Sequence, residues 1–117
     1  MVTRSYVPDR GDIVWLDFTA HAGHEQGGHR PGLVVSPKLY NERSSLALFC
    51  PITSRVRNRP FEVPLPNPGV VTGVVLADQI RSLDWIARDG QFAMKAAPQT
   101  MAETEAILST LLLPTLY

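Results

Sequence analysis

Cysteine is scarce in this chain, and its scarcity excludes one class of small protein. The single cysteine among the 117 residues, Cys50, cannot form the internal disulfide framework of small secreted domains. Cys50 lies between Phe49 and Pro51 in an apolar run, which is typical of a buried and unreactive thiol. We therefore expect a core held by apolar packing and a thiol without a catalytic role.

An excess of charge of one sign is also absent. Eleven basic and eleven acidic residues give a formal net charge of zero at pH 7. A neutral chain exerts no bulk electrostatic attraction on nucleic acid. Any binding of nucleic acid must therefore come from local clusters of lysine and arginine, so the positions of these residues matter more than their number.

Long hydrophobic runs are missing as well. No apolar stretch approaches the ~20 residues that a membrane-spanning helix needs, and the first ten residues lack the apolar segment of a signal peptide. We therefore expect a cytoplasmic protein that does not enter a membrane. The chain is 44% apolar and 19% charged and has no internal repeat or long linker, which predicts one globular domain over residues 1–117.

Short apolar and β-branched segments, separated by turn residues, predict a mainly β fold. The expected strands cover residues 12–18, 31–37, 46–52, 61–65 and 74–83. Pro64 places the fourth of them at an edge, because proline cannot donate to a central ladder. We expect one helical turn or a loop at residues 37–41, and a short strand or helix within residues 85–94. Five or more short strands of this kind predict a small barrel.

The end of the chain changes to a helical period. Residues 98–113 carry apolar side chains at three-to-four spacing, and these are Met101, Ile107, Leu108, Leu111 and Leu112. Thr100 and Glu103 have the spacing of a capping box, and Pro114 ends the segment. We expect one amphipathic helix that covers one side of the sheet.

A glycine-rich loop over residues 21–31 concentrates groups that can move protons or hold an anion. It contains Glu25, Arg30 and three histidines, and its glycines make it pliable. Expected strands on both sides pin the loop to a rigid frame, where binding and catalytic residues are common. A salt bridge between Glu25 and Arg30 that only stiffens the loop is the simpler alternative. A catalytic site needs a third partner, and the hydroxyl pair Thr53 and Ser54 at the end of a buried strand is a candidate.

The histidines raise the question of a metal site. His21, His24 and His29, with Glu25 or Asp17 as a further ligand, offer atoms that zinc accepts. Their spacing is His-x-x-His-Glu rather than His-Glu-x-x-His, and a glycine loop does not place two imidazoles on one helix face. We therefore predict no metal and no cofactor, and surface histidines of which one lies near a phosphate.

Three arginines alternate along the chain after the third expected strand, at Arg55, Arg57 and Arg59. Two interpretations stay open. The arginines belong to a solvated loop beside an edge strand, where charge deters aggregation, or they form a patch that follows a phosphate backbone. In the second case an aromatic residue such as Phe18 would stack on unpaired bases.

Taken in order, several motifs resemble the MazF/PemK family of toxins from toxin–antitoxin modules. The matching segments are residues 11–18, Gly23-x-Glu25-Gln26-x-Gly28-x-Arg30-Pro31, Ser36-Pro37 with Tyr40-Asn41, Pro51-x-Thr53, and Leu76-x-Asp78-Gln79-x-Arg81-Ser82. They span nearly the whole chain. The ordered combination is specific, although no single segment is.

The resemblance implies a small SH3-like barrel of the CcdB/PemK type with a C-terminal amphipathic helix, acting as a homodimer. It implies a sequence-specific, metal-independent endoribonuclease that cuts single-stranded RNA, an mRNA interferase, and a cognate MazE-type antitoxin whose disordered tail occupies the RNA groove. By resemblance, Glu25, Arg30 and Thr53 are the catalytic residues. Together with the loop and the basic patch, the expected RNA-binding residues are Phe18, His29, Ser54, Arg55, Gln79 and Arg81.

Metal-independent cleavage uses the 2′-hydroxyl of RNA as the nucleophile. Glu25 would remove its proton, since a free glutamate titrates at roughly 4.3 and is ionised at neutral pH. Arg30 would stabilise the phosphorane charge, and Thr53 would donate a hydrogen bond to a non-bridging oxygen. Guanidinium gives up protons poorly, which leaves water or His29 to protonate the 5′-oxygen. The expected products are a 2′,3′-cyclic phosphate and a 5′-hydroxyl, and DNA should not be cut.

Two other functions stay open on the sequence. CcdB-like toxins poison gyrase without catalysis and share this barrel, but they act through a tryptophan near the end of the C-terminal helix. This chain ends Leu116-Tyr117, and its tryptophans are Trp15 and Trp85. The other alternative is a small RNA-binding barrel in which Glu25 and Arg30 form only a structural ion pair.

Overall fold

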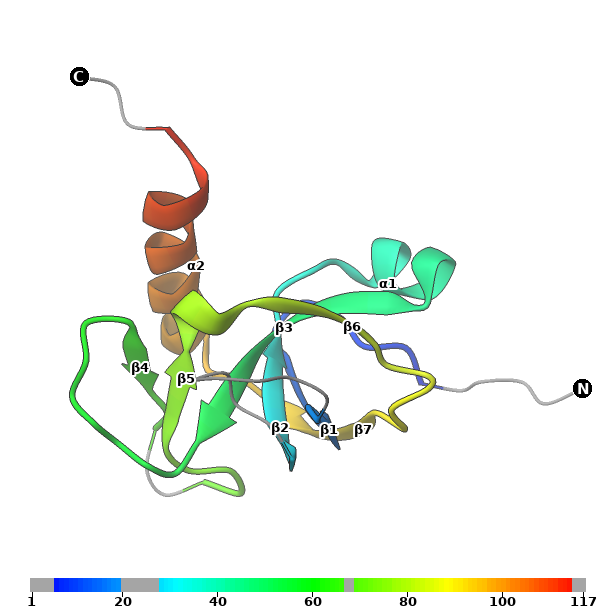
Figure 1. Cartoon of the computed structure of the whole chain (residues 1–117), viewed down its shortest axis with the longest axis horizontal. Helices are drawn as coiled ribbons and strands as arrows, with labels where there is room; N and C mark the ends of the chain where they lie inside the picture. Colours follow the sequence, from blue (N-terminus) through cyan, green and yellow to red (C-terminus); the bar gives the residue numbers. More distant parts are fainter. Residues whose placement is uncertain (1–5, 20–27, 67–68, 115–117) are drawn as a thin grey trace, which may run out of the picture.

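The computed structural model of the chain describes residues 6–19, 28–66 and 69–114. The strands are β1 (Asp12–Asp17), β2 (His29–Val34), β3 (Leu46–Thr53), β4 (Glu62–Pro64), β5 (Val74–Leu76), β6 (Arg81–Asp84) and β7 (Gln91–Lys95). The helices are α1 (Lys38–Ser44), the short 3₁₀ turn η1 (Ala77–Gln79) and α2 (Pro98–Leu112). α2 lies beside β4 and η1, whereas α1 lies at the other end of the sheet beside β3 (Figure 1).

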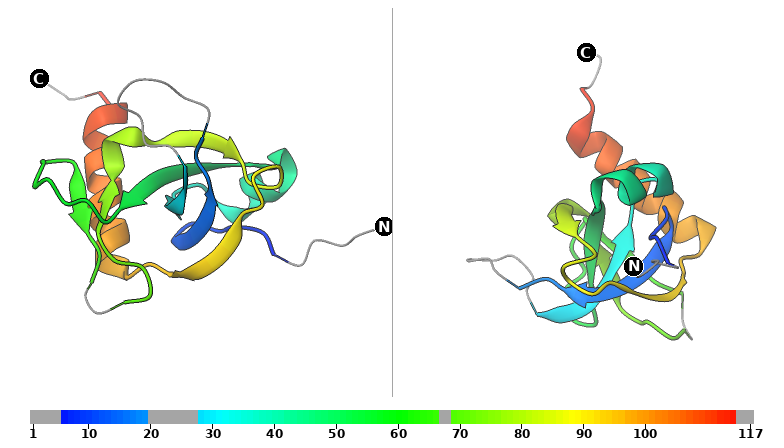
Figure 2. Two further views of the ribbon diagram at one scale, coloured as in Figure 1. Left: turned by 60° about the horizontal axis from the view of Figure 1, so that its bottom comes forward. Right: turned by 90° about the vertical axis from the view of Figure 1, so that its right-hand side faces the viewer.

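The sheet is antiparallel throughout and is organised around β3. The strands lie in the order β4-β5-β3-β2-β1-β7, and β6 also pairs with β3. Within the described residues β4 and β7 are the two ends of this sheet, and no ladder joins them, so the barrel-like sheet is open. Figure 2 shows β7 following β1 on the side of the sheet away from β4. The prediction of a mainly β, barrel-like fold with a C-terminal helix is confirmed, as is the edge position of the strand that contains Pro64.

The strand predicted over residues 74–83 is interrupted, so that prediction is wrong in its middle. β5 pairs with the end of β3 at Ile52↔Val75, and β6 pairs with the beginning of β3 at Phe49↔Arg81. The three residue steps from Phe49 to Ile52 in β3 therefore lie opposite the six residue steps from Val75 to Arg81. The surplus residues cannot join the ladder, and they fold into η1.

Alternate residues of the central strands fill two separate apolar clusters. Ile13 and Leu33 belong to one cluster, which Leu108 of α2 joins, whereas Val14 and Val34 belong to the other. Successive side chains of a strand point to opposite faces, which explains the division. The sheet is therefore apolar on both faces, and both are covered by other parts of the chain.

α1 replaces the single helical turn or loop expected at residues 37–41. Its buried Asn41 ties three segments together. The Nδ2 group donates to the carbonyl oxygens of Pro8 at 2.8 Å and Ser36 at 3.0 Å, and Oδ1 accepts from the Ser36 hydroxyl at 2.6 Å. Ser45, with a φ of 59°, ends the helix in the left-handed region. These contacts hold the start of the described chain against the sheet.

α2 follows the predicted helix closely, but the predicted capping box does not form. Ala97 occupies the N-cap without a side-chain bond, and Glu103 accepts a hydrogen bond from Gln99 Nε2 at 3.2 Å. Pro98 begins the helix, where its missing N–H would have had no helical partner. No helix within the described part of the chain has both the length and the apolar character needed to cross a membrane.

Cys50 is buried in the core, as its apolar flanks predict. Burial raises the pKa of its thiol to about 12, because the thiolate would lose hydration there. The thiol therefore stays protonated near neutral pH, and a nucleophilic role is excluded for the folded protein.

Candidate functional site

A cleft of about 410 Å³ lies where β2 begins and β3 ends. It is lined by Trp15, His29, Arg30, Pro31, Ile52, Thr53, Ser54, Val70, Val71 and Thr72. The β2–β3 ladder explains why Arg30 and Thr53 meet there. Its register pairs Gly32 with Pro51, and two further steps place Arg30 opposite Thr53. A guanidinium and a hydroxyl that are 23 positions apart in the sequence thus share one cleft.

Thr53 is held so that its hydroxyl can donate. The side chain is nearly buried, and Oγ1 accepts a hydrogen bond from the backbone N–H of Arg55 at 3.1 Å. A hydroxyl that accepts in this way still has its own hydrogen to donate. The geometry therefore favours Thr53 as a donor to an anion in the cleft.

Gly73 packs directly against the backbone of Thr53. A Cβ atom at this position would lie 2.1 Å from the Thr53 carbonyl oxygen, and its φ of +114° suits glycine alone. The Gly73 carbonyl oxygen accepts a hydrogen bond from Leu65 N at 3.0 Å. Glycine is thus required both for the close approach and for the turn that brings residues 70–72 to the wall of the cleft.

The opposite wall carries a stacked pair of rings. The Trp15 and His29 rings are parallel within 10°, and their centroids lie 5.6 Å apart. Trp15 is partly buried against the core, so it fixes the exposed imidazole beside Arg30. Trp15 thus belongs both to the packing of the core and to the lining of the cleft.

The described ends of the glycine-rich loop are tied to the sheet. The backbone N–H of Phe18 donates to the Gly28 carbonyl oxygen at 2.8 Å, and Arg88 Nη1 donates to the Asp17 carbonyl oxygen at 2.7 Å. Hydrogen bonds from Thr19 lower the pKa of the exposed Asp17 carboxylate, with smaller contributions from Arg88 and His29. Asp17 is therefore ionised at neutral pH.

A second, smaller cleft of about 120 Å³ adjoins the first, because Thr53 lines both. Its other lining residues are Arg55, Arg57, Arg59, Glu62, Leu76 and Gln79. Gln79 reaches this position because η1 takes it out of the strand ladder. The structure therefore places Arg30, Thr53, His29 and Ser54 on one cleft, and Arg55 and Gln79 on its neighbour.

Phe18 and Arg81 lie apart from both clefts. The Phe18 side chain is 0% exposed, and it stands edge-on to Phe49 with ring centroids 6.3 Å apart. A fully buried ring cannot stack on a base, so the predicted stacking of Phe18 on unpaired bases is wrong. Its physical role is to support Arg81, whose guanidinium lies 5.6 Å above the ring centroid and donates to the Phe18 carbonyl oxygen at 3.1 Å. Gly32 makes this burial possible, because a Cβ there would lie 2.7 Å from the ring.

Glu25, His21 and His24 lie outside the described residues. Within residues 6–19, 28–66 and 69–114, no three side chains of His, Cys, Asp or Glu gather closely enough to hold a metal ion. The contributions of Glu62, Gly73 and residues 70–72 to the two clefts have no signature in the sequence. Close approach at Gly73 depends on strand pairing with distant Thr53, which leaves no local pattern.

Comparison with known proteins supports one family. Residues 9–112 match the family described as PemK-like, MazF-like toxin of type II toxin-antitoxin system. The chain is 41% identical over 112 residues to the endoribonuclease toxin MazF of Escherichia coli (strain K12), which covers 96% of this chain and 99% of that protein. It is 37% identical over 116 residues to the endoribonuclease PemK of Escherichia coli, with 96% and 87% covered.

Solved structures extend the likeness to three dimensions. A crystal structure of MazF from Deinococcus radiodurans superposes with a TM-score of 0.89 at 52% identity, covering 92% of this chain and 98% of that chain. A crystal structure of MazE-MazF from the same organism gives a TM-score of 0.85 at 50% identity, with 95% and 100% covered. These likenesses run from the turn before β1 to the end of α2, and the chain therefore belongs to the family of PemK-like, MazF-like toxins of type II toxin–antitoxin systems.

Proposed function

We propose that this chain is a single toxin domain, residues 1–117, that cuts single-stranded RNA at a specific sequence as an mRNA interferase, without a metal or cofactor. The observation that carries the proposal is the shared cleft of Arg30 and Thr53. Relatives named endoribonuclease, MazF and PemK among them, support the reaction class. An RNA substrate and an antitoxin partner would place its action in the cytoplasm.

The proposed reaction divides its work among three side chains. Glu25, whose position lies outside the described residues, takes the proton of the 2′-hydroxyl as that oxygen attacks phosphorus. Arg30 neutralises the charge that builds on the phosphorane, where its fixed donors count for more than in the ground state. Thr53 donates its hydroxyl hydrogen to a non-bridging oxygen of the phosphate. The Thr53 Oγ1 atom already accepts a hydrogen bond from the Arg55 N–H, which leaves the hydroxyl hydrogen available to donate. The 5′-oxygen leaves with a proton from water or from His29, giving a 2′,3′-cyclic phosphate and a 5′-hydroxyl.

The proposed RNA path follows the two adjoining clefts. His29 and Ser54 would contact the nucleotides at the scissile bond, and Arg55 and Gln79 would contact the strand on the far side of Thr53. Arg81 is half-buried and lies outside both clefts, so we propose that it contacts RNA beyond them, while Phe18 supports it from the core. Direct base contacts within such a groove would set the sequence that is cut.

A protein partner is part of the proposal. The similar MazE-MazF structures from Deinococcus radiodurans support a cognate MazE-type antitoxin for this chain. We propose that a disordered segment of that antitoxin lies in the RNA groove and blocks it. Such a segment would order on binding and cover an extended surface.

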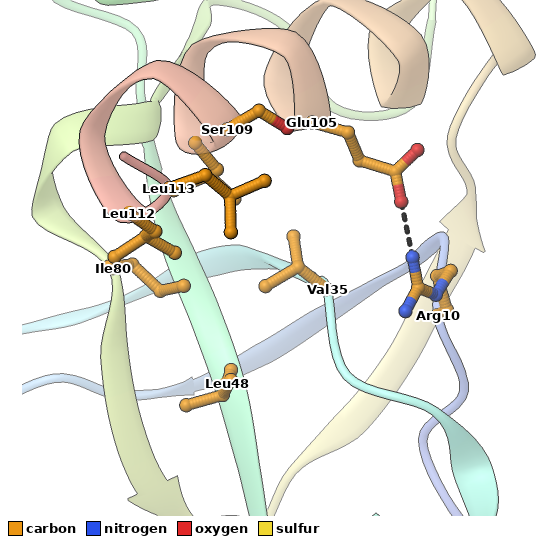
Figure 3. Close-up of a pocket in the computed structure, with 9 residues that line it drawn as sticks. Arg10, Val35, Leu48, Ile80, Glu105, Ser109, Leu112 and Leu113 are labelled. Atoms are coloured by element: carbon orange, nitrogen blue, oxygen red, sulfur yellow. Dashed lines mark hydrogen bonds and ion pairs between the residues drawn. The ribbon is translucent and has the colours of Figure 1, made fainter. Parts of the chain in front are cut away.

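We also propose a homodimer, for which an apolar groove at the end of α2 offers the contact. Leu112 and Leu113 are 64% and 62% exposed and stand above Val35, Leu48 and Ile80 (Figure 3). An ion pair between Arg10 and Glu105 borders the groove and leaves its rim neutral. A twofold dimer places one patch against its own copy, so an apolar centre with a balanced rim suits self-association.

One experiment separates this proposal from its alternatives. Purified protein is incubated with a long labelled RNA in the presence of a chelator, and the ends of any fragments are mapped. Cleavage with 2′,3′-cyclic phosphate ends supports the proposal, and loss of cleavage in Glu25→Ala and Arg30→Ala assigns it to this site. Full activity of either variant would remove the assigned mechanism. Trapped gyrase on DNA, or RNA binding without turnover, would favour the CcdB-like poison or the binding barrel instead.

A further inference from the structure

The loop between β3 and β4 is held in shape by one carboxylate. Glu62 Oε1 accepts hydrogen bonds from the backbone N–H groups of Arg57 at 3.1 Å and Asn58 at 2.9 Å. Its Oε2 also accepts from Arg57 N, at 3.2 Å. Asn58 has a φ of 56°, and this left-handed turn brings two successive N–H groups toward Glu62. The loop is thus folded around an acidic side chain of β4.

Both ends of the loop are anchored as well. At its start the Arg55 N–H donates to Thr53 Oγ1, and at its end the Glu62 N–H donates to the Arg59 carbonyl oxygen at 3.1 Å. Glu62 itself pairs with Leu76 in the β4–β5 ladder. The backbone of residues 54–59 is exposed but does not depend on its own side chains for its shape. Its three arginine side chains are therefore left for another purpose.

The charges around this loop point to a polyanion. Arg55, Arg57 and Arg59 are all exposed and line the smaller cleft together with Thr53 and Gln79. Among the described residues, none of the three guanidinium groups forms an ion pair with a carboxylate. The Glu62 carboxylate accepts hydrogen bonds from backbone N–H groups instead. It therefore fixes the loop that carries the three arginines and forms no ion pair with any of them.

We propose that this cleft is a second phosphate subsite for RNA and that Glu62 is the positioning residue that builds it. The inference rests on the proposed endoribonuclease function, because Thr53 joins the subsite to the cleft that holds Arg30. The subsite holds the phosphate of a neighbouring nucleotide, so that the strand crosses Thr53 with its scissile bond facing Arg30. Glu62 lines the smaller cleft but not the cleft that holds Arg30, so its proposed role is to fix the loop and not to act on the scissile bond.

The test depends on whether Glu62→Ala strengthens or weakens the binding of RNA. Glu62→Ala removes a negative charge beside three arginines, so charge alone would make RNA binding tighter. If the Glu62 carboxylate instead orders the loop, the loop of the Glu62→Ala variant becomes ordered only when RNA binds. Each residue that is fixed at that step costs roughly tenfold in affinity for RNA. We expect Kd and KM to rise about tenfold while kcat at saturation stays unchanged, because Glu62 does not touch the reacting atoms.

Three variants make the comparison sharp. Glu62→Gln retains the Oε1 atom that accepts from both N–H groups, and it should restore most of the affinity. Glu42→Ala makes the same change of charge on the exposed side of α1, and it should not weaken binding. Arg57→Gln keeps the backbone N–H, so the loop stays folded while one phosphate contact is lost, even if Glu62→Ala should prove too unstable to measure.

Binding is measured by fluorescence anisotropy with a 2′-O-methyl oligonucleotide that carries the sequence cut by the wild-type protein, over a range of salt concentrations. Each lost phosphate contact lowers the slope of log Kd against log salt by about 0.7 for a single strand. A wild-type protein that cuts no RNA would remove the proposed function and this inference with it. A wild-type protein that cuts RNA, with Glu62→Ala binding as tightly as Glu42→Ala and Arg57→Gln keeping the full slope, would overturn the subsite alone.

Discussion

Replacing Gly73 by alanine should damage catalysis more than its distance from the reacting phosphate suggests. The new Cβ atom would lie 2.1 Å from the carbonyl oxygen of Thr53 and 2.9 Å from the Cα of Ser54, and the contacts are with backbone atoms that cannot rotate away. Since Cβ contacts below 3.0 Å are essentially never seen, the oxygen and the new methyl group must separate by about 0.9 Å. Thr53 will therefore leave its place at the junction of the two clefts.

The size of the effect follows from that displacement. A misplacement of about 1 Å in a catalytic group costs about 100-fold in rate, so we expect kcat to fall about 100-fold. Alanine at a φ of +114° also stores backbone strain of about 1–3 kcal/mol. At a typical slope of about 1.5 kcal/mol/M, a loss of about 2 kcal/mol lowers the urea midpoint of unfolding by more than about 1 M.

Gly69→Ala provides the matched control in the same loop. Its Cβ would approach Pro66 and Val71 carbonyl oxygens no closer than 3.3 Å, which small movements relieve. Steady-state cleavage of a short RNA at saturating substrate gives kcat for both variants, and urea unfolding gives their stability. Gly73→Ala with wild-type kcat and a wild-type urea midpoint would show that the packing against Thr53 is not needed, and the argument for a precisely placed hydroxyl would fail.

The remaining predictions concern single side chains. Thr53→Val should lower kcat about 10- to 100-fold, because a hydrogen bond to a charged group is worth about 1.5–3 kcal/mol, whereas Thr53→Ser keeps the hydroxyl and most of the activity; equal rates would exclude a donor role. The hydroxyl of Tyr6 donates to Asp12 at 2.7 Å, and burial with this bond raises the pKa of Tyr6 above its ordinary value of 10.0. The stabilising contribution of the Tyr6 hydroxyl is therefore complete below pH 10 and is lost as the pH rises above 10. The Tyr6→Phe variant should show a smaller fall in urea midpoint between about pH 9.5 and 11.5 than the wild-type protein. An unchanged pH profile of the urea midpoint would contradict this. Cys50, buried and with its pKa raised to about 12, should react with a thiol reagent at pH 8 only after denaturation, and rapid labelling of the native protein would refute its burial.

Local patterns in the sequence predicted the positions of most strands and of the C-terminal helix, and they marked Arg30 and Thr53 as candidate site residues. Short apolar runs mark β1 and β3, because a strand that is covered on both faces needs apolar side chains at consecutive positions. Arg30 and Thr53 could be paired as candidates since each stands at the end of an expected strand, where a sheet offers side chains to an open edge. The C-terminal helix was predictable within one residue of its end for the same periodic reason.

The tertiary structure alone decided which side chains face the clefts. Phe18 is aromatic and close to the glycine-rich loop, yet it is buried because Gly32 on the next strand leaves room for its ring. Gln79 reaches the smaller cleft because six residues oppose three across the ladder with β3. Glu62 folds the arginine loop through hydrogen bonds to N–H groups four and five positions earlier. Register, close approach and bonds across a turn depend on the partner segment as much as on the residue itself, so they arise only when the strands are paired.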